Sequence, residues 1–235
     1  MSPKENNVSG LADKQTSLSV RNKTATQYRY LGGIRVVSDL WFNMVAGLVL
    51  GYALGAIPFG LLLTRLSGGG DIRTIGSGNI GATNVLRTGR KGMAALTLIL
   101  DMLKGLCAVW STTHYLPGGE ILAAAGAFFG HLFPVWLRFK GGKGSATYGG
   151  ILFGLFWQGG VIYAIMWFGV LIVSRLSSGA SLTAALSAPI AAVILGYYDL
   201  VPILSVCTLI IFWKHRGNIE RLMAGTEPRI GKSKS

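Results

Sequence analysis

The stretch GSGNIGATNVLRTGRKG, residues 76–92, combines glycine, small polar side chains and arginine between two long apolar stretches. Glycine allows backbone conformations in which successive N–H groups converge on an anion. Asparagine and serine add neutral hydrogen-bonding groups, and arginine adds a planar fork that matches phosphate or carboxylate. The stretch is therefore a candidate phosphate-binding loop, and the alternative is a flexible basic loop beside a membrane helix. Its candidate site residues are Ser77, Asn79, Gly81, Asn84 and Arg87.

The same stretch contains a G-x-G-x-x-G pattern, at residues 76–81, which is typical of dinucleotide-binding folds. Asp101 follows at the interval that such a site requires. However, the pattern works only after a strand and within a parallel sheet. Here an apolar helix is predicted before it, and Asp101 lies inside the next apolar stretch. The context therefore excludes a dinucleotide site.

A second glycine-rich segment, GHLFPVWLRFKGGKGSAT, covers residues 130–147. It places two ammonium groups and three glycines where a helix is predicted to begin near Ser145. The free N–H groups and the positive dipole end of that helix point at the loop, which makes it a physical anion site. For His131, packing between helices is favoured over a catalytic role. The candidate binding residues are Lys140, Gly141, Gly142, Lys143 and Gly144.

The third segment, KHRGNIERLMAGTEPRIG, covers residues 214–231 directly after the last apolar stretch. His215, Asn218 and Glu227 are its candidate site residues. One alternative is an ordinary cationic tail, but a lone acid such as Glu227 contributes nothing to membrane topology. We expect that carboxylate either to accept a hydrogen bond from a substrate hydroxyl or to position an arginine.

Asp101 and Lys104 are charged residues inside a predicted membrane span. Residues three apart share a face of a helix, and intramembrane charges usually face a cavity or one another. Two interpretations remain open: a structural ion pair, or the lining of a polar chamber in which Lys104 binds substrate.

Composition indicates an integral membrane protein. The 235 residues are 51% hydrophobic and only 13% charged, and the mean hydropathy is +0.50. The net charge of +13 fits cytoplasmic loops, an anionic substrate or anionic lipid. Nucleic acid is not expected as a partner, because the basic residues are scattered between apolar stretches. Cys107 and Cys207 lie in apolar stretches without metal-binding spacing, so no metal or cofactor is expected.

The predicted fold class is all-α, a polytopic membrane protein with about seven transmembrane helices, some of them short. Residues 1–40 are expected to form a polar, disordered tail, and 41–231 the membrane domain. Gly47, Gly51 and Gly55 form a small-residue ridge suited to close helix packing. We expect the stretch 145–175 to be two short helices joined near residues 158–160. The predicted apolar segments are 41–64, 93–114, 120–138, 145–158, 160–175, 180–197 and 199–213.

Charge distribution predicts the orientation of these spans. With seven spans, one side carries 15 of the 22 Lys and Arg residues together with all three segments, and the opposite loops carry none. The positive-inside rule places the charged side in the cytoplasm. The six basic residues of the N-terminal tail run against this orientation.

Together the three segments resemble the bacterial membrane glycerol-3-phosphate acyltransferases that use acyl-phosphate, the PlsY family. The matching stretches are SGNIGATNVLR, LDMLKG, GHLFPVWLRFKGGKGSAT and HRGNIERLMAGTEPR, within about residues 42–231. Ser145, Gly217 and Glu220 depart from the residues usual in that family. The long polar N-terminus is not part of the family pattern.

The resemblance implies a multi-pass protein of the bacterial inner membrane with its active site facing the cytoplasm. It implies fatty acyl transfer from acyl-phosphate to the 1-hydroxyl of glycerol-3-phosphate, giving lysophosphatidic acid and phosphate in the first step of phospholipid synthesis. It also implies membrane lipid as surroundings and functional coupling to the phosphate acyltransferase that makes acyl-phosphate. Ser77, Asn79 and His215 are the expected catalytic residues, with His215 or the departing phosphate as the base. The competing class is a transporter or channel for small anions.

Overall fold

The computed structural model describes residues 36–231, which are helical or irregular throughout that range. The chain divides into two compact units at residue 42. The described part of the first unit, residues 36–42, is helical. The predicted disordered tail, residues 1–40, lies outside the described residues apart from 36–40, which are helical. The second unit is described over residues 43–231.

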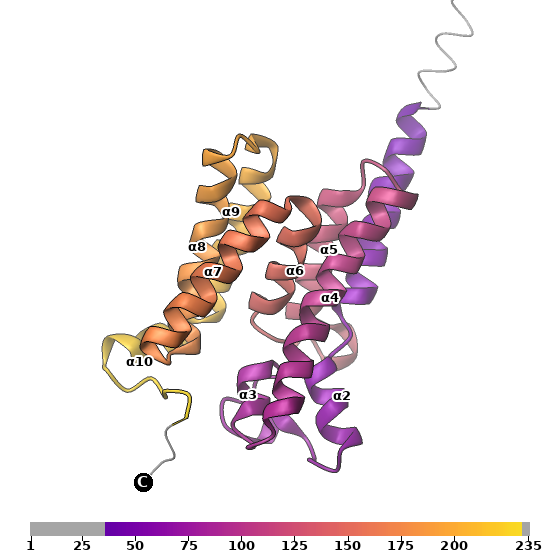
Figure 1. The fold of residues 1–235 in the computed structure, drawn as a ribbon. Coiled ribbons are helices and arrows are strands. Elements are labelled where there is room, and N and C mark those ends of the chain that lie inside the picture. The colour runs from indigo at the N-terminus through magenta and orange to yellow at the C-terminus, as the bar shows by residue number, and fades with distance from the viewer. Residues whose placement is uncertain (1–35, 232–235) are drawn as a thin grey trace, which may run out of the picture. The chain divides into compact units, whose positions relative to one another are not determined.

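The second unit begins with the remainder of the first helix, which runs to residue 55. The named helices follow it in chain order (Figure 1): α2 (Phe59–Leu66), α3 (Ala82–Leu86), α4 (Lys91–Tyr115), α5 (Glu120–Leu132), α6 (Ser145–Leu155), α7 (Trp157–Ser174), α8 (Ser177–Ile194), α9 (Val201–Lys214) and α10 (Arg216–Met223). Three short 3₁₀ turns also occur: η1 (Ile72–Thr74), η2 (Val135–Leu137) and η3 (Tyr198–Leu200).

Five helical segments are long and apolar enough to cross a membrane, and α9 with α10, bent by 62°, would form a sixth. The predicted count of seven is therefore not confirmed within residues 36–231. The predicted span without a counterpart in this count is the fourth, 145–158, which corresponds to α6, a helix of only 11 residues. The five segments are Val36–Leu66, Lys91–Tyr115, Glu120–Leu137, Trp157–Ser174 and Ser177–Ile194.

The predicted break within 145–175 is confirmed, although it lies at Phe156 rather than at 158–160. Phe156 is buried and extended. Its ring packs on Gly159, and the ring of Phe153 packs on Gly160. Side chains at these two glycines would collide with the rings, so the paired glycines allow the chain to turn tightly between α6 and α7.

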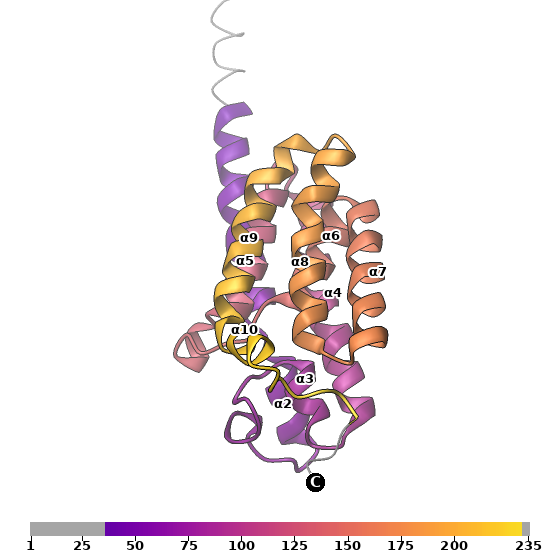
Figure 2. The ribbon, with the colours of Figure 1, turned by 90° about the vertical axis from the view of Figure 1, so that its left-hand side faces the viewer.

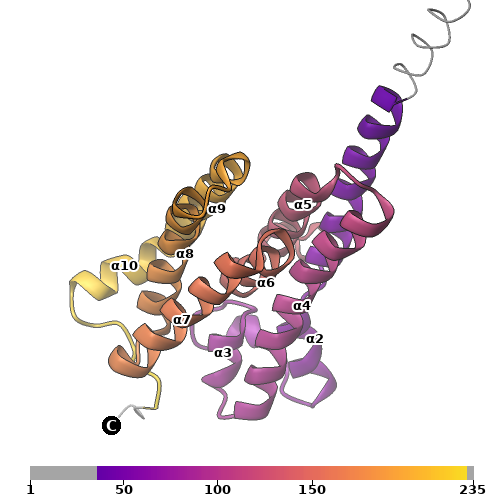
Figure 3. The same ribbon diagram turned by 45° about the horizontal axis from the view of Figure 1, so that its top comes forward.

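Helix α6 lies at the centre of the second unit. Figure 3 shows it between α4 and α5 on one side and α7 and α8 on the other, and it contacts all four. Glycines allow the closest crossings, since Gly105 of α4 packs on the Thr147 carbonyl and Gly150 of α6 packs on the Met102 carbonyl. Burial by neighbouring helices explains how so short a helix is stable in a membrane protein.

The predicted glycine ridge packs against α5. Gly51 lies against the backbone of Ala123, and Gly55 lies against Ala127. A Cβ at either glycine would overlap the backbone of α5. The small residues therefore permit the close helix contact that their spacing predicts.

The first helix ends at residue 55, and Pro58 is the N-cap of α2, which begins at Phe59. Such a break leaves carbonyl groups without helical partners, which is costly in an apolar environment. Here Lys104 Nζ donates to the Ile57 carbonyl at 2.8 Å, and Trp136 Nε1 donates to the Ala56 carbonyl at 2.8 Å. Two side chains distant in sequence thus stabilise the break.

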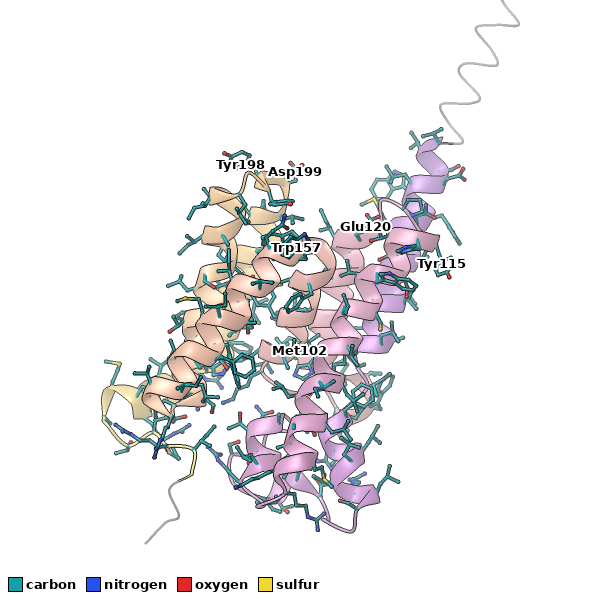
Figure 4. The ribbon with its side chains drawn as sticks, viewed as in Figure 1. Met102, Tyr115, Glu120, Trp157, Tyr198 and Asp199 are labelled. Carbon is teal, nitrogen blue, oxygen red and sulfur yellow. The ribbon has the colours of Figure 1, made fainter. Side chains whose placement is uncertain are left out.

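The three segments converge at one end of the second unit. Helices α2, α3 and α10 lie together at that end in two perpendicular views (Figure 1, Figure 2). Tyr115, Glu120, Trp157, Tyr198 and Asp199 mark the loops at the opposite end (Figure 4). This arrangement agrees with the predicted separation of the basic loops from the loops without Lys or Arg.

Candidate active site

The first segment is shaped by Asn84, which lies buried in α3. Its amide nitrogen donates to three carbonyls, those of Ile72, Ile75 and Asn79, each at 2.9 Å. Its oxygen accepts from the Ser77 N–H at 3.0 Å. Asn84 therefore holds residues 72–79 in place, and this use of its polar atoms leaves little capacity for a ligand.

Two other polar groups of this segment remain open. The Arg87 guanidinium and the Ser77 hydroxyl make no hydrogen bond or ion pair with residues 36–231, and both side chains are exposed. Arg87 lies along Gly76, whose positive φ of 58° suits glycine. An arginine without a protein partner at a cavity is available for an anion.

In the second segment, Gly141 and Gly142 close the end of α5. The Gly141 N–H donates to the Leu132 carbonyl at 3.1 Å, and the Gly142 N–H donates to the His131 carbonyl at 3.0 Å. These carbonyls are among those that a helix leaves unpaired at its C-terminus. The two N–H groups that were expected to bind phosphate thus already have protein partners.

Lys143, Asn218 and Glu227 form a bonded chain, in which hydrogen bonds link each side chain to the next. Lys143 Nζ donates to Asn218 Oδ1, and Asn218 Nδ2 donates to Glu227 Oε1 at 2.6 Å. Ser178 of α8 donates to the same carboxylate oxygen at 2.8 Å, and Arg221 Nε donates to Oε2 at 2.7 Å. The Glu227 carboxylate therefore positions an arginine, one of the two roles expected for it, and has three donors inside the protein.

The pKa values of Lys143 and Glu227 are shifted by burial and by their neighbouring groups. Burial lowers the pKa of Lys143 to about 8; the Glu227 carboxylate opposes this effect, and Arg221 and Arg87 add to it. Burial alone would raise the pKa of Glu227, but hydrogen bonds from Asn218, Ser178 and Arg221 hold it below its ordinary value. At neutral pH Lys143 is thus a cation near its titration point, beside a carboxylate that stays ionised.

His215 lies between α9 and α10 and is buried. Its Nδ1 is 2.8 Å from the Ile211 carbonyl, which can only accept a hydrogen bond. Nδ1 therefore carries the proton in the neutral ring, and Nε2 is the acceptor. This tautomer leaves one nitrogen able to receive a proton.

Beneath the glycine-rich loop 140–144 of the second segment lies a buried group of Asp101, Lys104 and His131. Lys104 Nζ is 2.8 Å from Asp101 Oδ1, and His131 Nδ1 is 3.7 Å from the same oxygen. Asp101 and His131 border the cavity described below, whereas Lys104 turns away to the Ile57 carbonyl. The two residues thus form an ion pair, as one interpretation expected, and Asp101 lines a cavity, as the other expected. Lys104 itself does not line the cavity.

One open cavity, whose empty space of about 1020 Å³ includes the solvent at its mouth, is lined by all three segments. Its polar end is lined from all three segments, by Ser77, Asn79, Gly81, Asn84, Arg87, Lys143, Gly144, His215, Asn218 and Glu227. Its apolar end runs between α4 and α7, over α6, and is lined by Leu98, Met102, Phe153, Trp167 and Phe168. Among residues 36–231 there is no cluster of three or more His, Cys, Asp or Glu placed to hold a metal ion.

Four predicted binding residues do not line this cavity: Lys104, Lys140, Gly141 and Gly142. Lys140 is exposed, and the other three bond within the protein. Conversely, sequence reasoning missed the serines of α8, because residues 174–180 were expected to be a loop. The signal was present in SSGAS, a run of small polar residues on the same side as the three segments. The missed serines are Ser177, Ser178 and Ser181.

Comparison with known proteins identifies the family. Residues 45–225 match the family model described as glycerol-3-phosphate acyltransferase. A glycerol-3-phosphate acyltransferase of Mesorhizobium japonicum is 56% identical over 190 residues, which cover 81% of this chain and 97% of that protein. One from Rhodopseudomonas palustris (strain BisB5) is 55% identical over 192 residues, covering 81% and 97%.

The fold also matches a solved structure. A crystal structure of PlsY, an integral membrane glycerol 3-phosphate acyltransferase, in its glycerol 3-phosphate form is 34% identical, with a TM-score of 0.75. The match covers 80% of this chain and 96% of that one. On the evidence of sequence, fold and the meeting of its three segments, the chain belongs to the glycerol-3-phosphate acyltransferase family of integral membrane proteins.

Proposed function

We propose that this protein transfers a fatty acyl group from acyl-phosphate to the 1-hydroxyl of glycerol-3-phosphate. The products are lysophosphatidic acid and inorganic phosphate, in the first step of phospholipid synthesis. One observation carries the proposal: a single cavity joins a cationic end, built from three separate segments, to an apolar end between helices. Such a cavity suits a phosphorylated headgroup and an acyl chain in one site.

The cations divide between two phosphates. Arg87 has no hydrogen-bond or ion-pair partner among residues 36–231 and offers its fork to glycerol-3-phosphate, aided by Asn79. Lys143 and the N-terminus of α6 at Gly144 face the acyl-phosphate. Arg221 does not line the cavity, and it neutralises the Glu227 carboxylate that does. The cavity therefore keeps positive charge for its ligands.

The donor simplifies the chemistry. The 1-hydroxyl oxygen attacks the acyl carbonyl carbon, and the bond from that carbon to the phosphate oxygen breaks. Because phosphate is a good leaving group, no covalent enzyme intermediate is needed, and catalysis comes from orientation and charge stabilisation. Ser77, whose hydroxyl is unbonded to the described residues, orients a ligand rather than attacking it.

Two groups are candidates for the base that accepts the hydroxyl proton: His215 Nε2 and the departing phosphate. His215 lines the cavity in the tautomer that leaves Nε2 able to accept. If His215→Ala retains nearly full turnover at neutral pH, the phosphate is the base. A loss of about 100-fold or more in kcat, with KM unchanged, assigns the base to His215.

The fold and the charge distribution support the proposed membrane location and orientation. The basic loops lie at the end that carries the three segments, so the positive-inside rule directs that end to the cytoplasm. The bacterial relatives make the inner membrane the expected location. There the acyl chain lies between α4 and α7 beside lipid, and the enzyme that makes acyl-phosphate supplies the donor.

The direct test is to incubate purified protein with acyl-phosphate and labelled glycerol-3-phosphate. We expect labelled lysophosphatidic acid and an equal amount of released phosphate. Parallel reactions with acyl-CoA and acyl carrier protein thioesters identify the donor. Equal or faster turnover with a thioester would refute the acyl-phosphate assignment. Proteoliposome uptake of labelled glycerol-3-phosphate without acylation would instead favour the transporter class.

A further inference from the structure

We propose that His131 is the positioning residue for Lys143: its imidazole is the surface on which Gly142 rests, and so it determines where the Lys143 ammonium lies in the cavity. The inference rests on the proposed function for the meaning of Lys143. It adds a role for a buried group of three ionisable residues that the reaction itself does not use.

The glycine-rich loop, residues 140–144, packs against the last turn of α5. Its backbone is tied there by the two hydrogen bonds that Gly141 and Gly142 donate. A Cβ at Gly142 would collide with the imidazole ring of His131, so the ring directly faces the Gly142 backbone. A Cβ at Gly141 would meet the His131 and Leu132 carbonyls and the Pro134 ring. The loop therefore has no freedom to approach α5 more closely.

The next residues leave equally little freedom. Gly144 has a φ of 93°, which strains any residue with a side chain. A Cβ there would come within 2.6 Å of the Phe128 ring. Lys143 is therefore fixed at its backbone on both sides, by Gly142 on the imidazole and by Gly144 on Phe128. Any sideways shift of the imidazole is transmitted to the lysine.

The Nδ1 side of the His131 imidazole contacts the buried Asp101–Lys104 pair. His131 Nδ1 faces Asp101 at 3.7 Å, Asp101 is paired with Lys104 at 2.8 Å, and Lys104 donates to the Ile57 carbonyl at 2.8 Å. The three side chains are each at most 4% exposed. A continuous row of contacts thus runs from the break in the first helix to the backbone beside Lys143.

The arrangement explains why this group is polar although it lies within the membrane domain. Buried charges are costly, and they persist where they pair with one another or serve function. Lys104 serves the helix break, Asp101 neutralises Lys104, and the imidazole is wide enough to support Gly142. The His131 carbonyl and ring therefore contact the same residue from two directions.

A double-mutant cycle on the full-length protein tests this directly. Gly142→Ala places a methyl group where the imidazole lies, and we expect it to raise KM for acyl-phosphate by about tenfold, with less effect on KM for glycerol-3-phosphate. His131→Ala removes the obstacle along with the support, and we expect a rise of about threefold. The double variant should then resemble His131→Ala, because its methyl group has room. Gly169→Ala, where a Cβ meets no atom within 4 Å, is the matched control and should leave both KM values unchanged.

The outcome is decided by the double variant. Recovery relative to Gly142→Ala supports the contact, whereas losses that multiply, or a Gly142→Ala variant with unchanged KM, overturn the proposal. If His131→Ala does not fold, His131→Asn, whose shorter amide also clears the space, replaces it in the cycle. Thermal unfolding in detergent confirms the folded state of each variant.

A second readout separates this inference from the proposed function. The rise in melting temperature caused by inorganic phosphate reports anion binding in the cavity without any turnover, and the part of the rise that Lys143→Ala removes reports binding at Lys143. It should be smaller for Gly142→Ala and restored in the double variant. If the wild type fails to use acyl-phosphate but the phosphate-induced shifts follow this order, the proposed donor is wrong and the positioning role stands. Equal shifts in all variants would refute the positioning role.

Discussion

The two polar walls of the cavity are organised differently. On the wall formed by the first segment, Asn84 holds the backbone with its own hydrogen bonds, and Arg87 is left without a partner among residues 36–231. On the opposite wall, Lys143, Asn218 and Glu227 are bonded to one another. On the first wall, Asn84 supports the backbone and a different residue, Arg87, is the proposed ligand-binding side chain. On the other wall, the same side chains both support one another and are proposed to face the ligand.

This difference predicts how substitutions behave. A ligand-facing residue without protein contacts can be changed without loss of stability, whereas a residue of a bonded chain cannot. Variants on the two walls should therefore separate activity from stability on one side and couple them on the other.

The largest expected effect is that of Arg87→Ala. Losing a charge-assisted fork to phosphate should lower kcat/KM for glycerol-3-phosphate by about 1000-fold. The melting temperature should stay within about 1 °C of the wild type, since the guanidinium makes no hydrogen bond or ion pair with the described residues. Steady-state kinetics and thermal unfolding are the measurements. Arg87→Lys should remain strongly impaired, because an ammonium cannot bind bidentately; full recovery in that variant would argue against the fork.

Asn84→Ala tests the supporting side chain of the same wall. Removing its hydrogen bonds leaves three buried or half-buried carbonyls short of a donor and should destabilise the protein by about 2–3 kcal/mol. Activity should fall about 100-fold because the segment that carries Ser77 and Asn79 loses its shape. Thermal unfolding and kinetics on the same preparation should therefore change together. A loss of activity with unaltered stability would show that Asn84 contacts ligand instead.

Glu227→Gln tests the bonded wall and its charge. We expect kcat/KM to fall about tenfold, because the partner of Arg221 becomes neutral. The pH profile is more specific. The carboxylate raises the pKa of Lys143, so its removal should lower that pKa below about 8.

The sign of the pH effect follows from this. Lys143 binds phosphate as an ammonium, so the wild-type kcat/KM for acyl-phosphate should decline as pH rises through about 8. In Glu227→Gln the decline should begin at lower pH. A shift to higher pH, or none, would show that Lys143 does not control this limb of the profile.

The smallest effect is expected for Lys140→Ala. Lys140 is exposed and does not line the cavity, although it lies three residues from Lys143. Kinetic parameters should change by less than about twofold. Lys143→Ala is the matched comparison and should raise KM for acyl-phosphate by about 30-fold. Equal losses in the two variants would move the anion site out of the cavity.

Much of the fold was predictable because hydrophobic length and charge asymmetry are direct consequences of the membrane. The approximate positions of the long helices followed from them, but the break at residues 56–58 and the helical residues 36–40 did not. The span count did not follow either, since α6 is stabilised by the helices around it rather than by lipid. Only its contacts with the four surrounding helices distinguish an 11-residue buried helix from a short membrane span.

The site was predictable in its residue types but not in their division of labour. The sequence indicates that Gly141, Gly142 and Asn84 belong to an anion site. Which backbone groups they bond depends on where α5 ends and how residues 72–79 turn, and both are set by tertiary packing. For the same reason the serines of α8 were missed, since their relevance depends on the neighbouring C-terminal segment.

The shortness of α6 has a consequence for traffic through the membrane. Eleven residues span about 16 Å, roughly half of a hydrocarbon layer about 30 Å thick. In the proposed orientation, so short a helix allows the loop before α6 to lie below the cytoplasmic surface of the bilayer. A membrane-borne donor would reach it by lateral diffusion, while a water-soluble acceptor descends along the polar wall. The new lipid would then depart sideways into the leaflet without its chain ever entering water.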